Sequence, residues 1–405
     1  MQQLKQGVFK MKQMGFAVCA ALVAVVGAQS AMAADWIVSG NDGKYQRVAG
    51  RDTYLANPPQ DTLTLLDGSV FPPKAVASFP VENGIQGPPQ AVAVTPNGTI
   101  AFVAAPTRYD QTAKKLIMDT FLQIVTLQGD GAGAIEKISL GSHPQAIAIN
   151  PAGTIALVTC VDGTAHVFQI EGSHVTEKNV LPLSKGRLAG ASFTHDGQHA
   201  LVALRDEQGV AVLNVVDGVV TDSGDRLSSG VAPYTVDVSS DGHWAVVSDV
   251  GLAGLANVGG RMIGDADALT LIDVSLSPAH PTFRSVQQIT VPSLPEGVAI
   301  SPDGKWIVAQ TMDGSNLLPG NPGRHDHGRL VLFAIRDGHA VEVSNIAGGE
   351  ASQGVIFTKD SRHVIVQYNV ERQLAFFSVI QGKLVDSGKR MSLSGAPSSI
   401  RSAPR

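Results

Sequence analysis

The sequence predicts an all-β protein, a seven-bladed β-propeller in which every blade is a four-stranded antiparallel sheet. Two observations carry this prediction. A fifteen-residue phrase returns along the chain, in which two alternating apolar runs flank a short turn, most often Asp-Gly or Asn-Gly. A further copy of the phrase is split between the two ends of the chain, so the ends must meet and close a ring.

The complete copies show the period-two alternation of β-strands. PQAVAVTPNGTIAFV is the first, and PEGVAISPDGKWIVA is the fifth. Successive copies begin 44 to 62 residues apart, a spread that disfavours a strict solenoid but suits a propeller, whose loops lengthen independently. In the fifth unit we expect strands at 297–300, 306–310, 329–335 and 340–345. The copies begin at Pro89, Pro144, Leu188, Pro233, Pro295 and Ser352.

The split copy predicts how the ring closes. Residues 397–405 (PSSIRSAPR) stop where the turn should come, and the missing half lies at 35–38 (DWIV), which matches KWIV at 305–308. We therefore expect the C-terminus to give the innermost strand of the last blade and the chain from Asp35 onward the outer three. This clasp would remove the free sheet edges.

Residues 1–33 have the pattern of a cleavable signal peptide, which leaves 34–405 as the propeller. Lysines precede an apolar run at 16–27, and Ala31-Met32-Ala33 forms a small-residue cleavage site. The apolar run is too short for a membrane span. We therefore expect a periplasmic protein, released by cleavage after Ala33. Only Cys160 remains in the mature chain, which suits a buried apolar side chain better than a reactive thiol.

The charge excludes one class of partner. The net charge of −5 becomes −8 when the three lysines of the signal leave, which argues against nucleic acid and against an anionic membrane surface. No other apolar run is long enough to span a bilayer.

Four loops between second and third strands are long, at 41–60, 106–119, 249–268 and 313–328. Strand alternation places them on the face where the innermost strands begin. Length without a folding reason suggests that this long-loop face carries the function.

The loop at 313–328 holds His325 and His327, one residue apart. An H-x-H pair alone is a weak metal signal, and no further ligand has a supporting spacing, so no metal site is predicted. A solvated polar loop and a general base are the other interpretations.

Arginines are spread over the same face, at Arg108, Arg205, Arg261 and Arg372. They would suit a carboxylate or another anionic ligand, or they are solvated rim charges.

The residues that begin the innermost strands line the channel. Glu296 is the single acid among them and is the best candidate acid or base, although a carboxylate held by a neighbouring arginine is equally consistent. The predicted channel residues are Gln90, Gln145, Tyr234, Glu296, Gln353 and Ser398. His143 directly precedes the second copy and is a further candidate.

The repeats resemble the YVTN-type propellers, on SPDGKWIV at 301–308 and VQYNVERQLAFFSV at 366–379. That superfamily includes 6-phosphogluconolactonase-like and carboxymuconate-cyclase-like lactonases, periplasmic YncE-like proteins, the heavy chain of methylamine dehydrogenase and the haem d1 propeller of cytochrome cd1. The resemblance covers essentially all of the mature chain. A lactonase site, as the resemblance implies it, needs a His, a Glu and arginines, which His143, Glu296, Arg261 and Arg324 could supply.

Three functions follow as hypotheses. The first is a periplasmic YncE-like propeller that binds a small anionic or lactone-like ligand, or a periplasmic protein partner, on its long-loop face. The second is a lactonase that uses Glu296 with His143, His325 or His327. The third is a haem d1 or redox-partner propeller. The sequence does not identify a cofactor.

Overall fold

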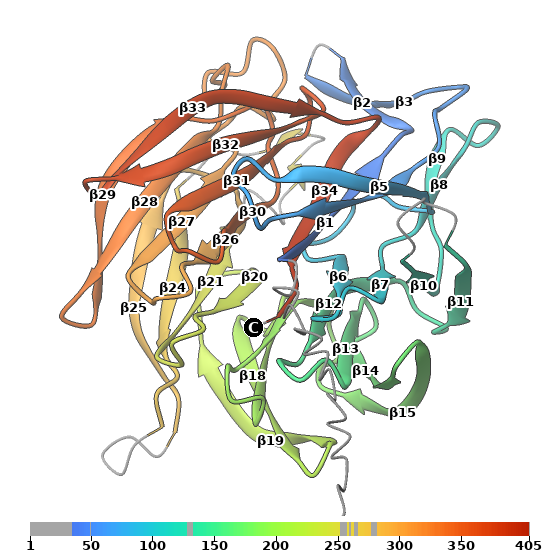
Figure 1. Ribbon diagram of the computed structural model, residues 1–405. Coiled ribbons are helices and arrows are strands. Elements are labelled where there is room, and N and C mark those ends of the chain that lie inside the picture. The colour runs from blue at the N-terminus through green and yellow to red at the C-terminus, as the bar shows by residue number, and fades with distance from the viewer. Residues whose placement is uncertain are drawn as a thin grey trace, which may run out of the picture. The chain divides into compact units, whose positions relative to one another are not determined.

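The computed structural model describes residues 35–48, 50–127, 133–251, 257–258, 261–262, 266–276 and 282–404, with the backbone alone at 257–258 and 261–262. Within these residues, seven four-stranded antiparallel sheets stand in a ring, and β34 runs toward its centre (Figure 1). The prediction of an all-β, seven-bladed propeller is confirmed. The predicted signal peptide at 1–33 lies outside the described residues.

The blades are numbered from the first complete repeat, and each is given from the channel outward. Blade 1 has β6 (Val92–Val94), β7 (Ile100–Val103), β10 (Phe121–Thr126) and β11 (Ile135–Ser139); blade 2 has β12 (Pro144–Ile149), β13 (Ile155–Cys160), β14 (Thr164–Glu171) and β15 (His174–Pro182); blade 3 has β16 (Leu188–Phe193), β17 (His199–Leu204), β18 (Gly209–Val216) and β19 (Val219–Ser228).

Blades 4 to 6 follow the same order. Blade 4 has β20 (Pro233–Val238), β21 (Trp244–Asp249), β24 (Asp267–Asp273) and β25 (Arg284–Val291); blade 5 has β26 (Pro295–Ile300), β27 (Trp306–Thr311), β28 (Arg329–Arg336) and β29 (His339–Ala347); blade 6 has β30 (Val355–Phe357), β31 (His363–Tyr368), β32 (Gln373–Ile380) and β33 (Lys383–Ser392). The strands expected in the fifth unit are all present, each one to three residues longer than predicted.

Blade 7 is the predicted clasp. Its sheet has the order β34-β1-β4-β5, with β34 (Ala396–Ser402) innermost and β1 (Trp36–Asp42), β4 (Thr62–Asp67) and β5 (Lys74–Pro80) outside it. Ile37 pairs with Ser402 and Asp42 with Ala396, with a register shift between Gly40 and Asn41, so the two ends of the sequence form one antiparallel ladder. The split repeat therefore predicted this pairing correctly.

Three of the long loops contain a short hairpin that was not predicted. These are β2 (Tyr45–Val48) with β3 (Arg51–Tyr54), β8 (Thr107–Asp110) with β9 (Lys115–Met118), and β22 (Asn257–Val258) with β23 (Arg261–Met262). Their few residues and mixed polarity carry too weak a period-two signal to be seen in the sequence.

The recurring turn between the first two strands has a physical cause that the fifth blade illustrates. Ser301 Oγ donates to Asp303 Oδ1 at 2.7 Å and accepts from the backbone N–H of Trp306 at 2.9 Å. Gly304 adopts φ +65°, which an L side chain rarely does. Thr95 with Asn97, Thr194 with Asp196, Ser239 with Asp241 and Thr358 with Asp360 make the same hydroxyl contact. The Ser or Thr and the Asp or Asn recur in the repeat because their side chains form the hydrogen bond that closes this turn.

The core lies between neighbouring blades. Phe102 of blade 1 and Phe168 of blade 2 belong to one buried cluster, and Ile307 of blade 5 packs with Val246 of blade 4. Cys160 is fully buried between blades 1 and 2, as expected, and burial raises the pKa of its thiol to about 12. Such a thiol stays protonated and unreactive near neutral pH.

Among the described residues, no helix has both the length and the apolar character that crossing a bilayer requires.

Candidate functional site

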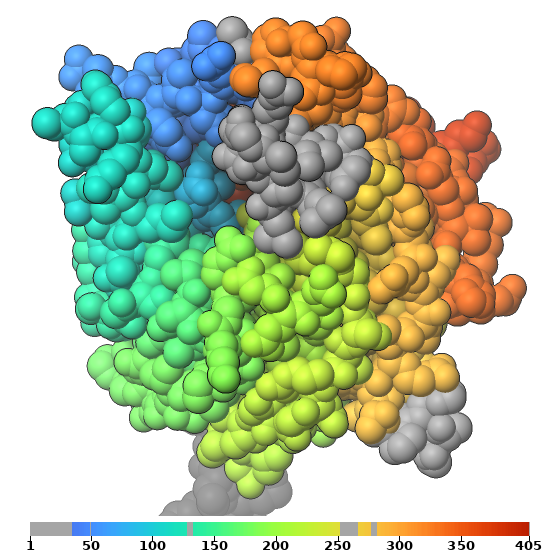
Figure 2. Space-filling view, turned by 180° about the vertical axis from the view of Figure 1, so that it is seen from behind, coloured from blue at the N-terminus to red at the C-terminus, as the bar shows by residue number. Residues whose placement is uncertain are grey.

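The innermost strands of the seven blades surround a channel whose two ends differ. Each of these strands begins at the same end, which also carries the long loops. We call this end the mouth; the opposite end, where the Ser/Thr–Asp turns lie, is the turn end. Figure 2 shows the face that carries the long loops, where the hairpin β2–β3 (blue) stands beside the loop at 313–328 (orange).

The ladders of the innermost strands are interrupted where they start, at the mouth. The pairing shifts between Pro144 and Ala146 in β12, between Pro233 and Val236 in β20, and between Pro295 and Gly297 in β26. A β-bulge leaves the extra residue outside the ladder and re-aims its side chain. The bulged residues include Gln145, Tyr234 and Glu296, three of the predicted channel residues.

Gln90 crosses the channel below this ring. Its Nε2 donates to the carbonyl of Val236 at 2.7 Å, and its Oε1 accepts from the N–H of Val236 at 3.1 Å. Gln90 belongs to blade 1 and Val236 to blade 4, so one amide bridges opposite sides of the ring. A Cβ at Gly190 would lie 2.2 Å from Gln90 Oε1, which explains the glycine there. The bridge forms a floor to the mouth.

Glu296 is the acid of the mouth. It is 9% exposed, and its Oε2 has no hydrogen-bond partner within the described part of the chain. Burial raises the pKa of this carboxyl to about 7, against the lowering effect of the Arg205 charge. A buried carboxyl near its midpoint at neutral pH can give or take a proton.

Arg205 and Tyr234 stand beside Glu296. The guanidinium of Arg205 lies 4.3 Å from the centre of the Tyr234 ring, a cation–π contact between blades 3 and 4. Burial, and then the Glu296 charge, raise the pKa of Tyr234, so its phenol stays protonated. The hydroxyl of Thr235 donates to the carbonyl of Glu296 at 2.7 Å, which ties β20 to β26.

A second arginine supports this group from blade 3. Arg187 binds Asp206 through two nitrogens, with contacts of 2.7 to 3.2 Å. Asp206 directly follows Arg205, so this bidentate pair holds the short loop that carries Arg205. The mouth therefore presents a protonatable carboxyl, a phenol and a guanidinium on a rigid frame.

Other polar atoms around the mouth also lack partners within the described residues. His143 is 3% exposed, and its Nδ1 lies 2.7 Å from the carbonyl of Asp119 while its Nε2 has no partner. Burial lowers the pKa of His143. Gln353 is also buried, and its Oε1 has no partner. Buried polar atoms of this kind normally find a partner, so they mark places where a ligand or water can bind.

His325 and His327 lie apart from this group. His325 Nδ1 lies 2.8 Å from the carbonyl of Asp313 and 3.0 Å from its carboxylate, and the His325 side chain is 61% exposed. His327 is exposed. No contact joins either histidine to Glu296 among the described residues.

The remaining predicted arginines are engaged by neighbouring chain segments. Arg324 donates to the carbonyls of Ser315 and Leu317, which pins its own loop. Arg108 pairs with Asp119 at 3.1 Å and is largely exposed. Arg372 donates to the carbonyl of Tyr45 at 2.9 Å. Arg261 begins β23, and its side chain lies outside the described part of the chain.

Three long loops join into a wall over blades 5, 7 and 1. Tyr54 of the β2–β3 hairpin stacks on Tyr109 of the β8–β9 hairpin, with ring centres 4.5 Å apart. On the other side of the β2–β3 hairpin, Arg47 donates to the carbonyl of Asn316. A cavity of about 610 Å³ lies between that hairpin and the loop at 313–328, a volume in the range of small-molecule sites.

The described residues contain no group of three or more His, Cys, Asp or Glu side chains placed to hold a metal ion.

Comparisons with known proteins agree with this architecture. A proposed 6-phosphogluconolactonase from Bacteroides uniformis is similar over 92% of this chain and 100% of its own, with a TM-score of 0.67 and 12% identity. The periplasmic gluconolactonase of Pseudomonas aeruginosa matches over 91% and 99%, with a TM-score of 0.63 and 15% identity. The chain has the fold of the lactonase-like propellers. The predicted resemblance is confirmed, and at these identities it concerns the fold alone.

Sequence comparison adds little to this. No family model matches the chain. WD repeat-containing protein 1 of Xenopus tropicalis is 33% identical over 81 residues, which are 20% of this chain and 13% of that protein. The match therefore spans a small part of either protein.

The grouping of Arg205 with Tyr234 and Glu296 was not predicted, although each residue was noted separately. A usable signal does exist, because Tyr234 and Glu296 occupy the same repeat position in consecutive blades. The short loop of blade 3 then brings Arg205 to the same end of the channel.

Proposed function

We propose that the mouth of the channel binds a small acidic ligand, a carboxylic acid or a lactone that carries a negative charge. The observation that carries this proposal is the group of Glu296, Arg205 and Tyr234, in which a buried carboxyl oxygen without a protein partner lies beside a guanidinium. The guanidinium would hold the anionic group of the ligand, and the Glu296 carboxyl would bind its hydroxyl or ring oxygen.

Binding is tested by titrating the purified chain from Ala34 onward with gluconate, 6-phosphogluconate and their lactones in a calorimeter. Arg205→Gln should weaken the tightest of these at least tenfold, and Tyr234→Phe should weaken it less, because the aromatic ring remains. Arg226→Gln is the matched control, since Arg226 forms an Asp222 pair of similar chemistry on the outer strand of blade 3. Equal binding by Arg205→Gln and the native protein would refute the proposal.

Lactone hydrolysis at the same site is a second candidate, favoured by one observation. Burial raises the pKa of Glu296 to about 7, the range in which a carboxylate can act as a general base on water. The likeness to lactonase propellers supports the scaffold for this reaction. None of the three predicted histidines, His143, His325 and His327, has a contact with Glu296 among the described residues.

Hydrolysis is tested by proton release from sugar and aromatic lactones. We expect Glu296→Gln to abolish turnover while the protein still binds the hydrolysed acid, because Arg205 and Tyr234 remain. Turnover that persists in Glu296→Gln would exclude Glu296 as the base. Binding without turnover in the native protein would leave the first proposal standing alone.

Export to the periplasm, with cleavage after Ala33, is part of the same proposal. It is supported by the signal-like pattern of residues 1–33 and is compatible with the periplasmic gluconolactonase of similar fold. N-terminal sequencing of protein from a periplasmic extract should begin at Ala34. No contact among the described residues favours the haem d1 or redox-partner alternative, so it is not proposed.

A further inference from the structure

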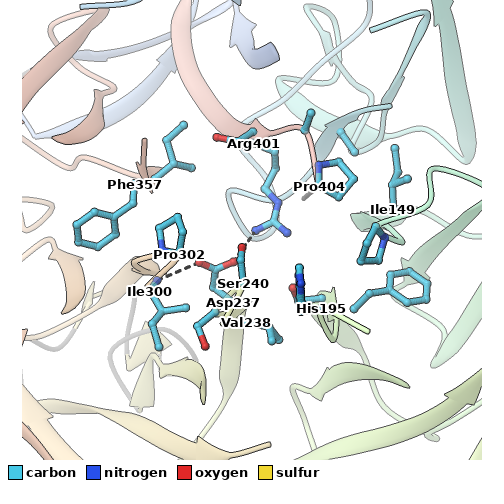
Figure 3. Close-up of a pocket in the computed structure, with 18 of the residues that line it drawn as sticks. Ile149, His195, Asp237, Val238, Ser240, Ile300, Pro302, Phe357, Arg401 and Pro404 are labelled. Atoms are coloured by element: carbon cyan, nitrogen blue, oxygen red, sulfur yellow. Dashed lines mark hydrogen bonds and ion pairs between the residues drawn. The ribbon is translucent and has the colours of Figure 1, made fainter. Parts of the chain in front are cut away.

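The turn end of the channel contains a second cavity, separated from the mouth by the Gln90 bridge. Its volume is about 130 Å³. A water molecule needs roughly 10–15 Å³ on this measure, so the space corresponds to a ligand of roughly ten non-hydrogen atoms. Residues from all seven blades line it, and Figure 3 shows ten of them labelled around a central ion pair.

The cavity exists because of one layer of the repeat. At the fifth position of each copy, four blades carry the small residues Ala93, Ala148, Ser192 and Ala299. Blade 6 has Ile356 there. The other two blades carry the only charges of the layer, Asp237 on β20 and Arg401 on β34. Small side chains leave room at the axis, and the two opposite charges face each other across it.

The Asp237–Arg401 pair is loosely made. Arg401 Nη1 lies 3.3 Å from Asp237 Oδ1, the one contact of the pair, and each side chain is 20% exposed. Asp237 Oδ2 accepts from the N–H of Ile300 at 3.0 Å. By contrast, Arg226 and Arg390 each bind their aspartates through two nitrogens at 2.6 to 2.8 Å. Charge-assisted bonds are normally 2.7–2.9 Å, so the channel pair leaves bonding capacity unused.

Apolar side chains flank the pair on two sides within a lining that also contains polar groups. In Figure 3, Phe357 and Ile300 lie on one side of it and Ile149 on the other. Pro302 and Pro404 also line the cavity, and the polar residues His195 and Ser240 occupy the same repeat position in blades 3 and 4. A pair of opposite charges flanked by the side chains of Ile149, Ile300 and Phe357 would recognise a molecule that has two opposite charges and an apolar group.

We propose that this cavity binds a small zwitterion, an α-amino acid or a betaine-like molecule with a modest apolar side chain. Its carboxylate would bind Arg401, its ammonium group would bind Asp237, and its side chain would contact Ile149, Ile300 and Phe357. The ligand would replace the long Asp237–Arg401 contact with two charge-assisted contacts, one to each residue. It would add no net charge to the cavity. A simple acid or amine would leave one buried charge uncompensated, which is costly.

The proposal is tested by calorimetric titration with L-alanine, L-valine and L-leucine. 4-Methylpentanoate and 3-methylbutylamine, which lack the amino and the carboxyl group of leucine, serve as analogues. We expect the best of the amino acids to bind with Kd below about 1 mM and at least tenfold tighter than either analogue. No binding by any of the three amino acids at about 10 mM, or equal binding by one analogue, would overturn it.

Three variants locate the site. Arg401→Gln and Asp237→Asn should each weaken binding at least tenfold, and Asn can still accept the Ile300 N–H. Ser192→Leu keeps both charges but fills the cavity, so it should abolish binding without breaking the pair. Arg226→Gln is the control and should bind like the native protein. Native affinity in Ser192→Leu, with its fold confirmed by circular dichroism, would place any binding elsewhere and refute the assignment.

Discussion

The mouth and the turn end are built from the same seven strands, yet they obey different rules. At the turn end five blades repeat one hydrogen-bond pattern, in which a Ser or Thr hydroxyl binds an Asp or Asn two residues later. At the mouth the ladders are broken by bulges, and the residues that begin the innermost strands are Gln, Tyr, Glu and Ser. The turns are needed to fold each blade. The bulged residues form no ladder pairs, so their side chains are available for binding.

Both ends of the channel depend on the closure of the ring by β34. Loss of β34 is therefore expected to have the largest effect on stability. Removing residues 396–405 deletes β34, leaves the edge of β1 unpaired and removes a wall from both ends. We expect no cooperative unfolding transition in urea. A truncated chain that unfolds as sharply as the native protein would show that the ring closes without β34.

Gly190 tests the floor between the two ends. In Gly190→Val the new side chain would meet Gln90 Oε1 and the carbonyl of Tyr234, which a Cβ would approach to 2.2 and 2.5 Å. We expect a loss of about 3 kcal/mol in the free energy of unfolding, from overpacking and a displaced Gln90. Gly218→Val is the control, because a Cβ there meets nothing within 4 Å, although its φ of +78° adds some strain. A loss for Gly190→Val no larger than that for Gly218→Val in urea unfolding would show that the Gln90 contact does not set the cost.

Glu296 tests the electrostatics of the mouth. Its pKa in the folded state is about 7, above the ordinary value of 4.5. Below pH 4.5 the carboxyl is protonated in both states and the group has no effect. As the pH rises toward 7 the unfolded chain loses the proton first, so stability falls. Glu296→Gln should therefore be more stable than the native protein by about 2–3 kcal/mol at pH 8 and equal to it at pH 4. Urea unfolding at both pH values measures this, and a constant difference would contradict it.

A substitution in one of the Ser/Thr–Asp turns is expected to have the smallest effect on stability. It lies at the turn end and should leave the mouth unchanged. Asp303→Ala removes the acceptor of the Ser301 hydroxyl at 2.7 Å and should cost about 1 kcal/mol. Asp241→Ala in blade 4 should cost the same, because its contact with Ser239 is equivalent. Thermal unfolding of both variants checks this. A large difference between them would show that the turns are not interchangeable.

The fold was predictable because its signals are local and repeated. Asp303 and Gly304 indicate a turn from neighbouring residues alone. The split repeat implied that the strand with Ile37 pairs with the strand with Ser402. The site was less predictable, because its contacts join residues that have no common local pattern. Gln90 binds the backbone of Val236, 146 positions away, and nothing in either segment indicates the partner. Arg324 looked available for a ligand, but the carbonyls of its own loop use it.

Closing the ring through β34 also has a kinetic side. Ile37 and Ser402 pair across nearly the whole chain, so the entropy of joining them must be overcome late, after the intervening blades exist. Until then the edge of β1 stands open to any other strand. A chain delayed at this stage would be prone to exchange its last strand with a neighbouring copy, and crowded or rapid production should favour such swapped pairs.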